Sequence, residues 1–263
     1  MSVAIATPGV GPLLKDWRRR RRLSQLELAV EAEVSTRHLS FVETGRSKPS
    51  RELLLHLAEH LDVPLRDRNG LLLAAGYAPD YRETPLDDAT MAPVRDALDK
   101  VLAGHEPFPA VIVDRRWTLV SANAPAQAIL ADGVAPHLLE PPVNTMRVSL
   151  HPDGLAPRIE NLAEYGQHLV TLVQRTASLT GDPALDALEA ELRAYPGIDG
   201  DDAPEVEPAT AMFVPLQLRT ERGVLSLFST IATFGTALDI TLAELAIESF
   251  FPADRATADA LRG

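Results

Sequence analysis

The stretch at residues 24–50, SQLELAVEAEVSTRHLSFVETGRSKPS, constrains this chain more than any other. Ser24 with Glu27 forms the S-x-x-E pattern of a helix N-terminus, and a second start signal follows at Ser35. Only residues 31–34 separate the two predicted helices, which leaves room for no more than a turn. Two short amphipathic helices across such a turn make a helix-turn-helix unit, whose second helix can enter the major groove of DNA.

The second helix of this unit and the loop after it carry side chains suited to DNA. The outward positions of the helix hold hydrogen-bonding or flat groups that can contact base edges. The loop GRSKPS places two cations where a phosphate backbone would run. The alternative is an ordinary helical hairpin. The candidate DNA-binding residues are Ser35, Thr36, Arg37, His38, Ser40, Phe41, Arg46 and Lys48.

Charge is divided unevenly along the chain, which has a net charge of −12. Residues 1–51 hold ten Lys or Arg and five Asp or Glu, a balance of +5 that includes the arginine run at 18–22. The remainder carries −17. A basic end on an acidic body is expected where only one domain meets phosphate, and the acidic part would discourage non-specific binding to DNA.

The segment LSQLELA…VSTRHLSFVETGRSKPSRELLLHLAEHLDVP resembles the repressor-type helix-turn-helix of the xenobiotic-response-element-like family. The resemblance implies that Gln25 begins the first helix of the motif and contacts phosphate. It also implies that Thr36, Arg37 and Phe41 occupy the base-facing positions of the recognition helix.

Two further expectations come from the same resemblance. Glu43 matches the family's acidic residue that pairs with an arginine of the preceding helix, which is Arg18 here. The family usually has glycine in the turn where this chain has Glu33. If Glu33 adopts a left-handed conformation, it costs on the order of 1 kcal/mol.

Helix start and stop signals divide the first part of the chain into five predicted helices. Apolar side chains at helical spacing give these helices a small common core. A turn follows at residues 77–81. We therefore assign residues 1–82 to an all-α helix-turn-helix domain and residues 83–104 to a linker and connecting helix.

The second part of the chain mixes predicted strands with helices. Residues 110–113 and 117–121 are rich in β-forming residues on either side of a turn, which predicts a hairpin. The segment 132–159 is rich in proline and is predicted to be irregular. The block 242–251 fits a helix or a strand, and we favour a closing strand. The other predicted elements are helices at 123–131, 161–177 and 183–194 and strands at 212–218 and 224–234.

Four blocks of this part resemble the MmyB-like ligand-binding domain, which in its family follows this type of helix-turn-helix. They are VIVDRRWTLVSAN, LHPDGLAPRIEN, TGDPALDALEAEL and FSTIATFGTALDITLAELAIESFFPAD, and they lie in order within residues 105–258. The resemblance implies a PAS-like fold and a regulator tuned by a small molecule, with acyl chains as a candidate class. The expected fold is α+β, with the five-helix domain followed by a PAS-like α+β sensor domain at 105–263.

Aromatic and polar groups near the predicted sheet are candidates for a ligand pocket. The aromatic groups could equally be plain core. Arg147 stands out because the segment TMRVSL is otherwise apolar, and it could pair with a ligand carboxylate or with an internal acid. The candidate walls are Trp117, Phe228, Phe234 and Phe250, and the candidate polar anchors are Asn123, Arg147 and His151.

Several classes of function are disfavoured. We find no nucleophile elbow, Walker loop or dinucleotide glycine fingerprint, so we expect no enzyme and no cofactor. Cysteine is absent, which excludes disulfides and thiolate metal sites. His151 and Asp153 in HPDG fit a turn with a side-chain cap better than a metal site. With no membrane-length apolar run and no signal peptide, we expect a cytoplasmic protein.

These features predict a transcriptional regulator that binds a double-stranded DNA operator as a homodimer. Its second domain would sense a small apolar or acyl-type ligand, such as a fatty acid. The alternative is a DNA-binding protein whose second domain serves dimerisation only, without a ligand.

Overall fold

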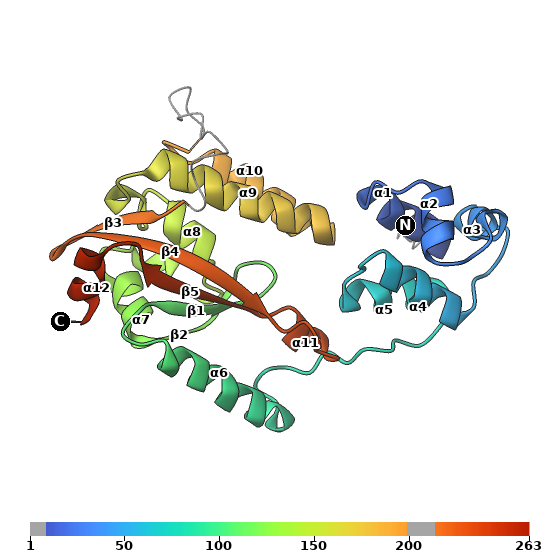
Figure 1. Cartoon of the computed structure of the whole chain (residues 1–263), viewed down its shortest axis with the longest axis horizontal. Helices are drawn as coiled ribbons and strands as arrows, with labels where there is room; N and C mark the ends of the chain where they lie inside the picture. The colour runs from blue at the N-terminus through green and yellow to red at the C-terminus, as the bar shows by residue number, and fades with distance from the viewer. Residues whose placement is uncertain (1–8, 199–213, 263) are drawn as a thin grey trace, which may run out of the picture. The chain divides into compact units, whose positions relative to one another are not determined.

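The computed structural model describes residues 9–198 and 214–262, which form two compact units (Figure 1). The first unit runs to Thr84 and also contains residues 236–243, which include the short helix α11 (Ile240–Ala243). The second unit holds the rest of the described chain. No helix among the described residues is long and apolar enough to span a membrane.

Five helices make up the main body of the first unit, as predicted from the capping signals. Ser24 caps the motif's first helix, where its hydroxyl accepts from the Glu27 amide at 3.1 Å and the Glu27 carboxylate accepts from the Ser24 amide at 2.7 Å. The predicted capping box is therefore confirmed. The helices are α1 (Val10–Arg20), α2 (Gln25–Glu31), α3 (Thr36–Glu43), α4 (Arg51–His60) and α5 (Leu65–Ala74).

A buried ion pair joins α1 to the end of α3, and it confirms the expected pairing of Arg18 with Glu43. The Arg18 guanidinium donates to both carboxylate oxygens at 2.6 and 2.8 Å and to the Leu23 carbonyl at 2.7 Å. Gly11 lies directly beside it, and a Cβ there would come within 2.5 Å of the Val42 carbonyl. The close approach of α1 to α3 therefore depends on glycine at this position.

The turn between α2 and α3 has the left-handed residue that the resemblance implied. Glu33 has a φ of 51°, a conformation in which glycine is normally preferred. The turn is closed by the Val34 amide, which donates to the Ala29 carbonyl at 2.9 Å. The helix-turn-helix geometry is retained with a non-glycine residue in the turn.

The second unit is built on a five-stranded antiparallel sheet. Its order, β2-β1-β5-β4-β3, puts the last strand in the centre, and this α+β arrangement is consistent with a PAS-like domain. The closing strand favoured for residues 242–251 is confirmed from Ala246 onward, with its bounds at Ala246–Pro252, whereas residues 242–243 belong to α11. The strands are β1 (Ala110–Val113), β2 (Leu119–Ala122), β3 (Leu216–Thr220), β4 (Gly223–Thr233) and β5 (Ala246–Pro252).

Helices lie on both sides of this sheet (Figure 1). The helices α8 (Thr145–Leu150), α9 (Leu162–Thr180) and α10 (Pro183–Arg193) pack together on one side. The helix α6 (Ala92–Gly104) lies on the other, where His105 directly after it packs against Phe251 with ring centroids 4.8 Å apart. The sheet therefore has a buried surface on each side.

Two expectations for the second unit need correction. The segment predicted to be irregular contains α8, whose first turn is capped by Asn144 accepting from the Arg147 amide at 3.1 Å. The helix α12 (Arg255–Arg262) was not predicted, and it is anchored where the Ser226 amide donates to the Thr257 hydroxyl at 2.9 Å. The predicted start of β3 at residue 212 lies outside the described residues.

The ion pair predicts how stability depends on pH. Burial favours the neutral form of Glu43, but hydrogen bonds from Arg18 and Gln25, together with the nearby positive charge, outweigh it and hold the pKa below its ordinary value. Because the folded-state pKa is the lower one, this stabilisation is present above the unfolded-state pKa and is lost as the pH falls through the folded-state pKa.

We expect Glu43→Gln to lower the free energy of unfolding of this unit by about 3–5 kcal/mol, because Arg18 is left as an unpaired buried cation. The variant should also lack the acid-dependent loss of stability that comes from Glu43. Urea-dependent hydrogen exchange of the α3 amides measures both effects. Asp16→Asn, which removes an exposed pair with Arg20, is the control and should change stability by less than about 1 kcal/mol. Equal effects of the two substitutions would contradict the structural role of the buried pair.

Candidate functional site

The first candidate site is the exposed face of α3. Ser35 caps the helix, with its hydroxyl accepting from the His38 amide at 3.4 Å. Leu39 and Val42 turn inward and are fully buried, which leaves Arg37 and His38 exposed to solvent. Thr36, Ser40 and Phe41 are half-buried on the helix. One face of α3 therefore packs into the core of the unit, and the opposite face lies toward solvent.

Cations surround the aromatic ring on this face. The guanidinium carbons of Arg37 and Arg46 lie 5.3 and 5.9 Å from the centroid of the Phe41 ring. The Phe41 carbonyl accepts from the Arg46 amide at 2.8 Å, which fixes the start of the basic loop against the end of α3. Lys48 is exposed further along the loop, with its ammonium 4.8 Å from the Tyr77 ring. Base-edge and phosphate contacts need donors arranged side by side in this way.

Two polar side chains of the basic end hold the helices of the first unit together. Gln25, expected to contact phosphate, donates to the Glu43 carboxylate at 2.7 Å and so joins the pair with Arg18. Arg21 donates to the Leu61 and Asp62 carbonyls, both at 2.7 Å. The arginine run therefore divides into side chains that tie helices together and the exposed Arg19, Arg20 and Arg22.

The second candidate site is a cavity of about 70 Å³ inside the second unit. It lies between the sheet and the helices α7 (Ala124–Ala131), α8 and α9. Most of its lining is apolar, and its polar members are Thr145, Ser149, Tyr165 and Glu248. The apolar lining residues are Pro109, Val111, Ala126, Ile129, Leu130, Met146, Leu155, Leu169, Leu216, Leu227 and Phe250.

Two ionisable groups of this cavity have strongly shifted proton affinities. Burial raises the pKa of the Glu248 carboxyl, against a hydrogen bond with Ser229 that lowers it. Burial, with the neighbouring Glu248, raises the pKa of the Tyr165 hydroxyl far above its usual range. The low-polarity environment therefore disfavours the ionised form of both groups.

Of the candidate ligand residues, only Phe250 lines this cavity. Trp117 is buried in the core of the unit with a φ of 64°, and its indole nitrogen has no hydrogen-bond partner in the described part of the chain. Asn123 caps α7 and accepts from the Ala110 amide at 2.9 Å. Phe228 stacks on Phe251 with centroids 5.4 Å apart.

The remaining three candidates also lie outside the cavity lining. Phe234 is half-buried directly after β4. Arg147 donates to both Glu191 carboxylate oxygens at 2.8 Å, the internal pairing left open as an alternative. His151 is half-buried beside Tyr195, with ring centroids 5.1 Å apart.

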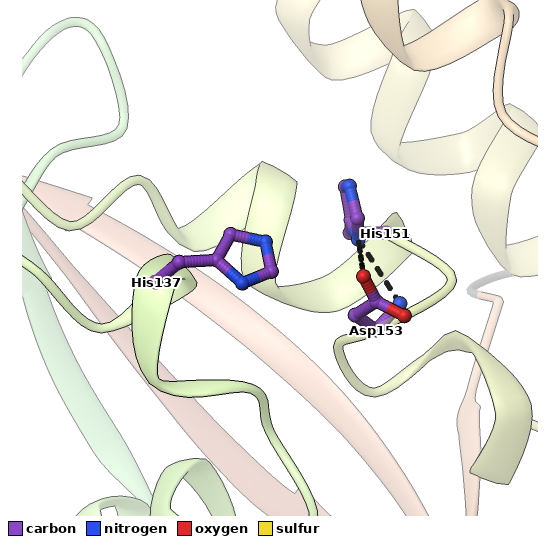
Figure 2. A group of neighbouring side chains, drawn as sticks. All are labelled: His137, His151 and Asp153. Atoms are coloured by element: carbon purple, nitrogen blue, oxygen red, sulfur yellow. Dashed lines mark hydrogen bonds and ion pairs between the residues drawn. The ribbon is translucent and has the colours of Figure 1, made fainter.

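His151 also belongs to the one group of possible metal ligands found among the described residues, with His137 and Asp153 (Figure 2). One ligand atom from each lies within 4.8 Å of the others. However, His151 Nδ1 already accepts from the Asp153 backbone amide at 3.0 Å, as expected for a capped turn. A metal ion using this nitrogen would have to break that bond, so the group fits a turn better.

Sequence reasoning missed all four polar residues that line the cavity, including its two ionisable groups. Glu248 follows Ile247 in a strand that is otherwise apolar except for Ser249, and Tyr165 lies on the buried side of α9. The only available signal was an acid within the largely apolar block AIESFF. That signal has meaning only once the block is known to be a central strand.

Family models match both parts of the chain. The model described as helix-turn-helix matches residues 14–67, and the model described as MmyB-like transcription regulator ligand binding domain matches residues 94–263. No functionally curated protein matches the sequence. A solved structure of an RNA-binding light-oxygen-voltage receptor aligns with a TM-score of 0.29 and 11% identity, covering 98% of this chain and 62% of that chain. On its family-model matches, the chain belongs to the helix-turn-helix regulators that carry an MmyB-like transcription regulator ligand binding domain.

Proposed function

We propose that this protein binds a specific DNA operator as a homodimer and that a small apolar ligand, with acyl-type molecules among the candidates, sets its affinity for that operator. The observation that carries the proposal is the pair of exposed arginines against the half-buried Phe41 ring, with Arg37 on the recognition helix and Arg46 in the loop after it. The apolar cavity in the second unit supports the sensing half of the proposal. We propose no enzymatic activity.

The homodimer follows from the reach of one recognition helix. A single helix in the major groove covers too few base pairs for tight and selective binding, and two-fold dimers on pseudo-palindromic sites are the usual solution. We expect two protomers on each operator in light scattering of the complex. A monomer both free and on DNA would refute the homodimer.

For α3 and the loop after it, we predict two different losses of DNA binding. Both are measured on an operator selected from a random library. Arg37→Ala should weaken operator binding by about 1–3 kcal/mol and relax base preference, if the guanidinium makes a bidentate base contact. Lys48→Ala should weaken operator and random DNA alike and make the salt dependence shallower.

Arg219→Ala in β3 is the matched control, because this exposed arginine lies in the second unit and pairs with Glu160. It should leave both DNA affinities unchanged. An Arg37→Ala variant that retains full base preference would remove Arg37 from base recognition.

The cavity predicts coupling between ligand and DNA. At about 70 Å³ it is smaller than the roughly 300–1,000 Å³ typical of drug-sized ligand sites, so a long chain must enlarge it. A ligand that binds the DNA-competent and incompetent forms unequally typically changes operator affinity 5–150-fold. Calorimetry of the ligand-stripped protein with medium- and long-chain fatty acids, with and without operator, measures this coupling.

Ala126→Leu, which adds volume to the cavity wall, should abolish ligand binding and the coupling. Ala131→Leu at the exposed end of the same helix is the control and should leave both intact. Melting curves establish that each variant is folded. Ligand binding without any change in operator affinity would favour the alternative that the second domain serves dimerisation only.

A further inference from the structure

The central strand of the sheet, β5, places the carboxyl group of Glu248 in the lining of the apolar cavity. Glu248 pairs in register with Val111 on one side and Ile231 on the other, so it sits in the interior of the sheet. Because side chains alternate along a strand, Glu248 and Phe250 share the cavity face while Ile247 points to the opposite face. Only 6% of Glu248 is exposed.

Within the described part of the chain, the cavity wall offers this carboxyl group no cation. The described residues that line the cavity include no lysine, arginine or histidine. Among the described residues, the polar groups that interact with Glu248 are hydroxyls. Ser229 is a hydrogen-bond partner, and Tyr165, whose pKa the nearby Glu248 helps to raise, lines the same cavity. A buried carboxyl group without a counter-ion is neutral, and a neutral carboxyl both donates and accepts hydrogen bonds.

A purely structural role for Glu248 is the simpler alternative. If Glu248 were buried only to bond Ser229, close packing around its carboxyl group would be expected, because a buried polar group without a hydrogen-bond partner costs free energy. Glu248 instead lines a cavity, and Tyr165, which carries a hydroxyl group, lines the same cavity. This arrangement leaves hydrogen-bonding capacity directed at whatever occupies the cavity.

We propose that Glu248 and Tyr165 form the polar end of the cavity and select apolar ligands that carry an uncharged oxygen, as a hydroxyl or carbonyl group, over carboxylates and amines. The inference rests on the proposed ligand-sensing function and names the ligand class of that same cavity. It makes Glu248 the residue that determines head-group specificity.

The charge on the ligand decides between the three head groups. A carboxylate could accept from the hydroxyl groups but would meet no cation in the described lining, so its negative charge would be buried without a counter-ion. An ammonium group would require Glu248 to ionise. The free energy needed to desolvate both ions is then about as large as the free energy gained from their attraction. A hydroxyl or carbonyl oxygen accepts from the neutral carboxyl or from Tyr165 without burying any net charge.

Three ligands of equal chain length isolate this choice. We would titrate 1-octanol, octanoate and octylamine into the full-length, ligand-stripped protein at neutral pH and follow binding by calorimetry and by NMR shifts of cavity methyl groups. Octanol should bind about tenfold or more tightly than either charged ligand, given the usual loss for a buried polar group without a partner. Tighter binding of octanoate or octylamine would overturn the head-group inference and leave the sensing function intact.

Variants assign the preference to named groups. Glu248→Leu should remove the preference for octanol, and Glu248→Gln should retain most of it because an amide also donates and accepts. Tyr165→Phe should weaken octanol binding several-fold without changing octylamine. Glu189→Gln, an acid paired with Arg193 on α10 away from the cavity lining, is the control and should change nothing.

Each remaining outcome also has a definite meaning. Melting curves show whether Glu248→Leu is folded, and Glu248→Gln keeps the test open if it is not. An unchanged octanol preference in folded Glu248→Leu would overturn the role of Glu248. Failure of all three ligands to bind, with fatty acids also inactive, would overturn the proposed sensing function itself.

Discussion

The Arg18–Glu43 ion pair is the constraint on which the DNA-facing part of the structure depends. Glu43 is the last residue of the recognition helix, and its carboxylate is only 1% exposed. The pair with Arg18 and the bond from Gln25 tie α1, α2 and α3 together at one point. Because a buried carboxylate is costly unless fully paired, any shift of α3 relative to its supporting helices would expose an uncompensated charge. The direction of the recognition helix is thus set electrostatically.

This arrangement separates two uses of arginine that look alike in sequence. Arg18 and Arg21 donate to acceptors inside the helical unit and hold it together. Arg37 and Arg46 lie against the Phe41 ring instead, with their guanidinium groups near solvent. Arg37 and Arg46 are therefore the arginines that we propose for DNA contacts, whereas Arg18 and Arg21 hold the helices of the unit together.

The second unit buries an acid whose ionisation is disfavoured, whereas the helical unit buries one whose ionisation is favoured. Glu43 and Glu248 are both buried, but one meets a guanidinium and the other meets only hydroxyl groups. Their pKa values consequently move in opposite directions from the same ordinary value. One carboxyl group stabilises the packing of the helices as an anion, and the other is the group that we propose as an uncharged hydrogen-bonding partner for a ligand.

Local signals in the sequence determined the helix-turn-helix, because capping residues and helical apolar spacing act within a few residues. The Ser24–Glu27 capping box is one such signal, and the left-handed Glu33 was anticipated from the motif. The β1–β2 hairpin and the closing strand were also predictable, since β-forming residues cluster there. Tertiary structure alone decided what faces the cavity. Arg147 found an internal partner 44 residues away, and Glu248 reached the cavity through its register with Val111. Strand register and long-range pairing depend on the whole fold, because a shift of one residue turns every side chain to the other face.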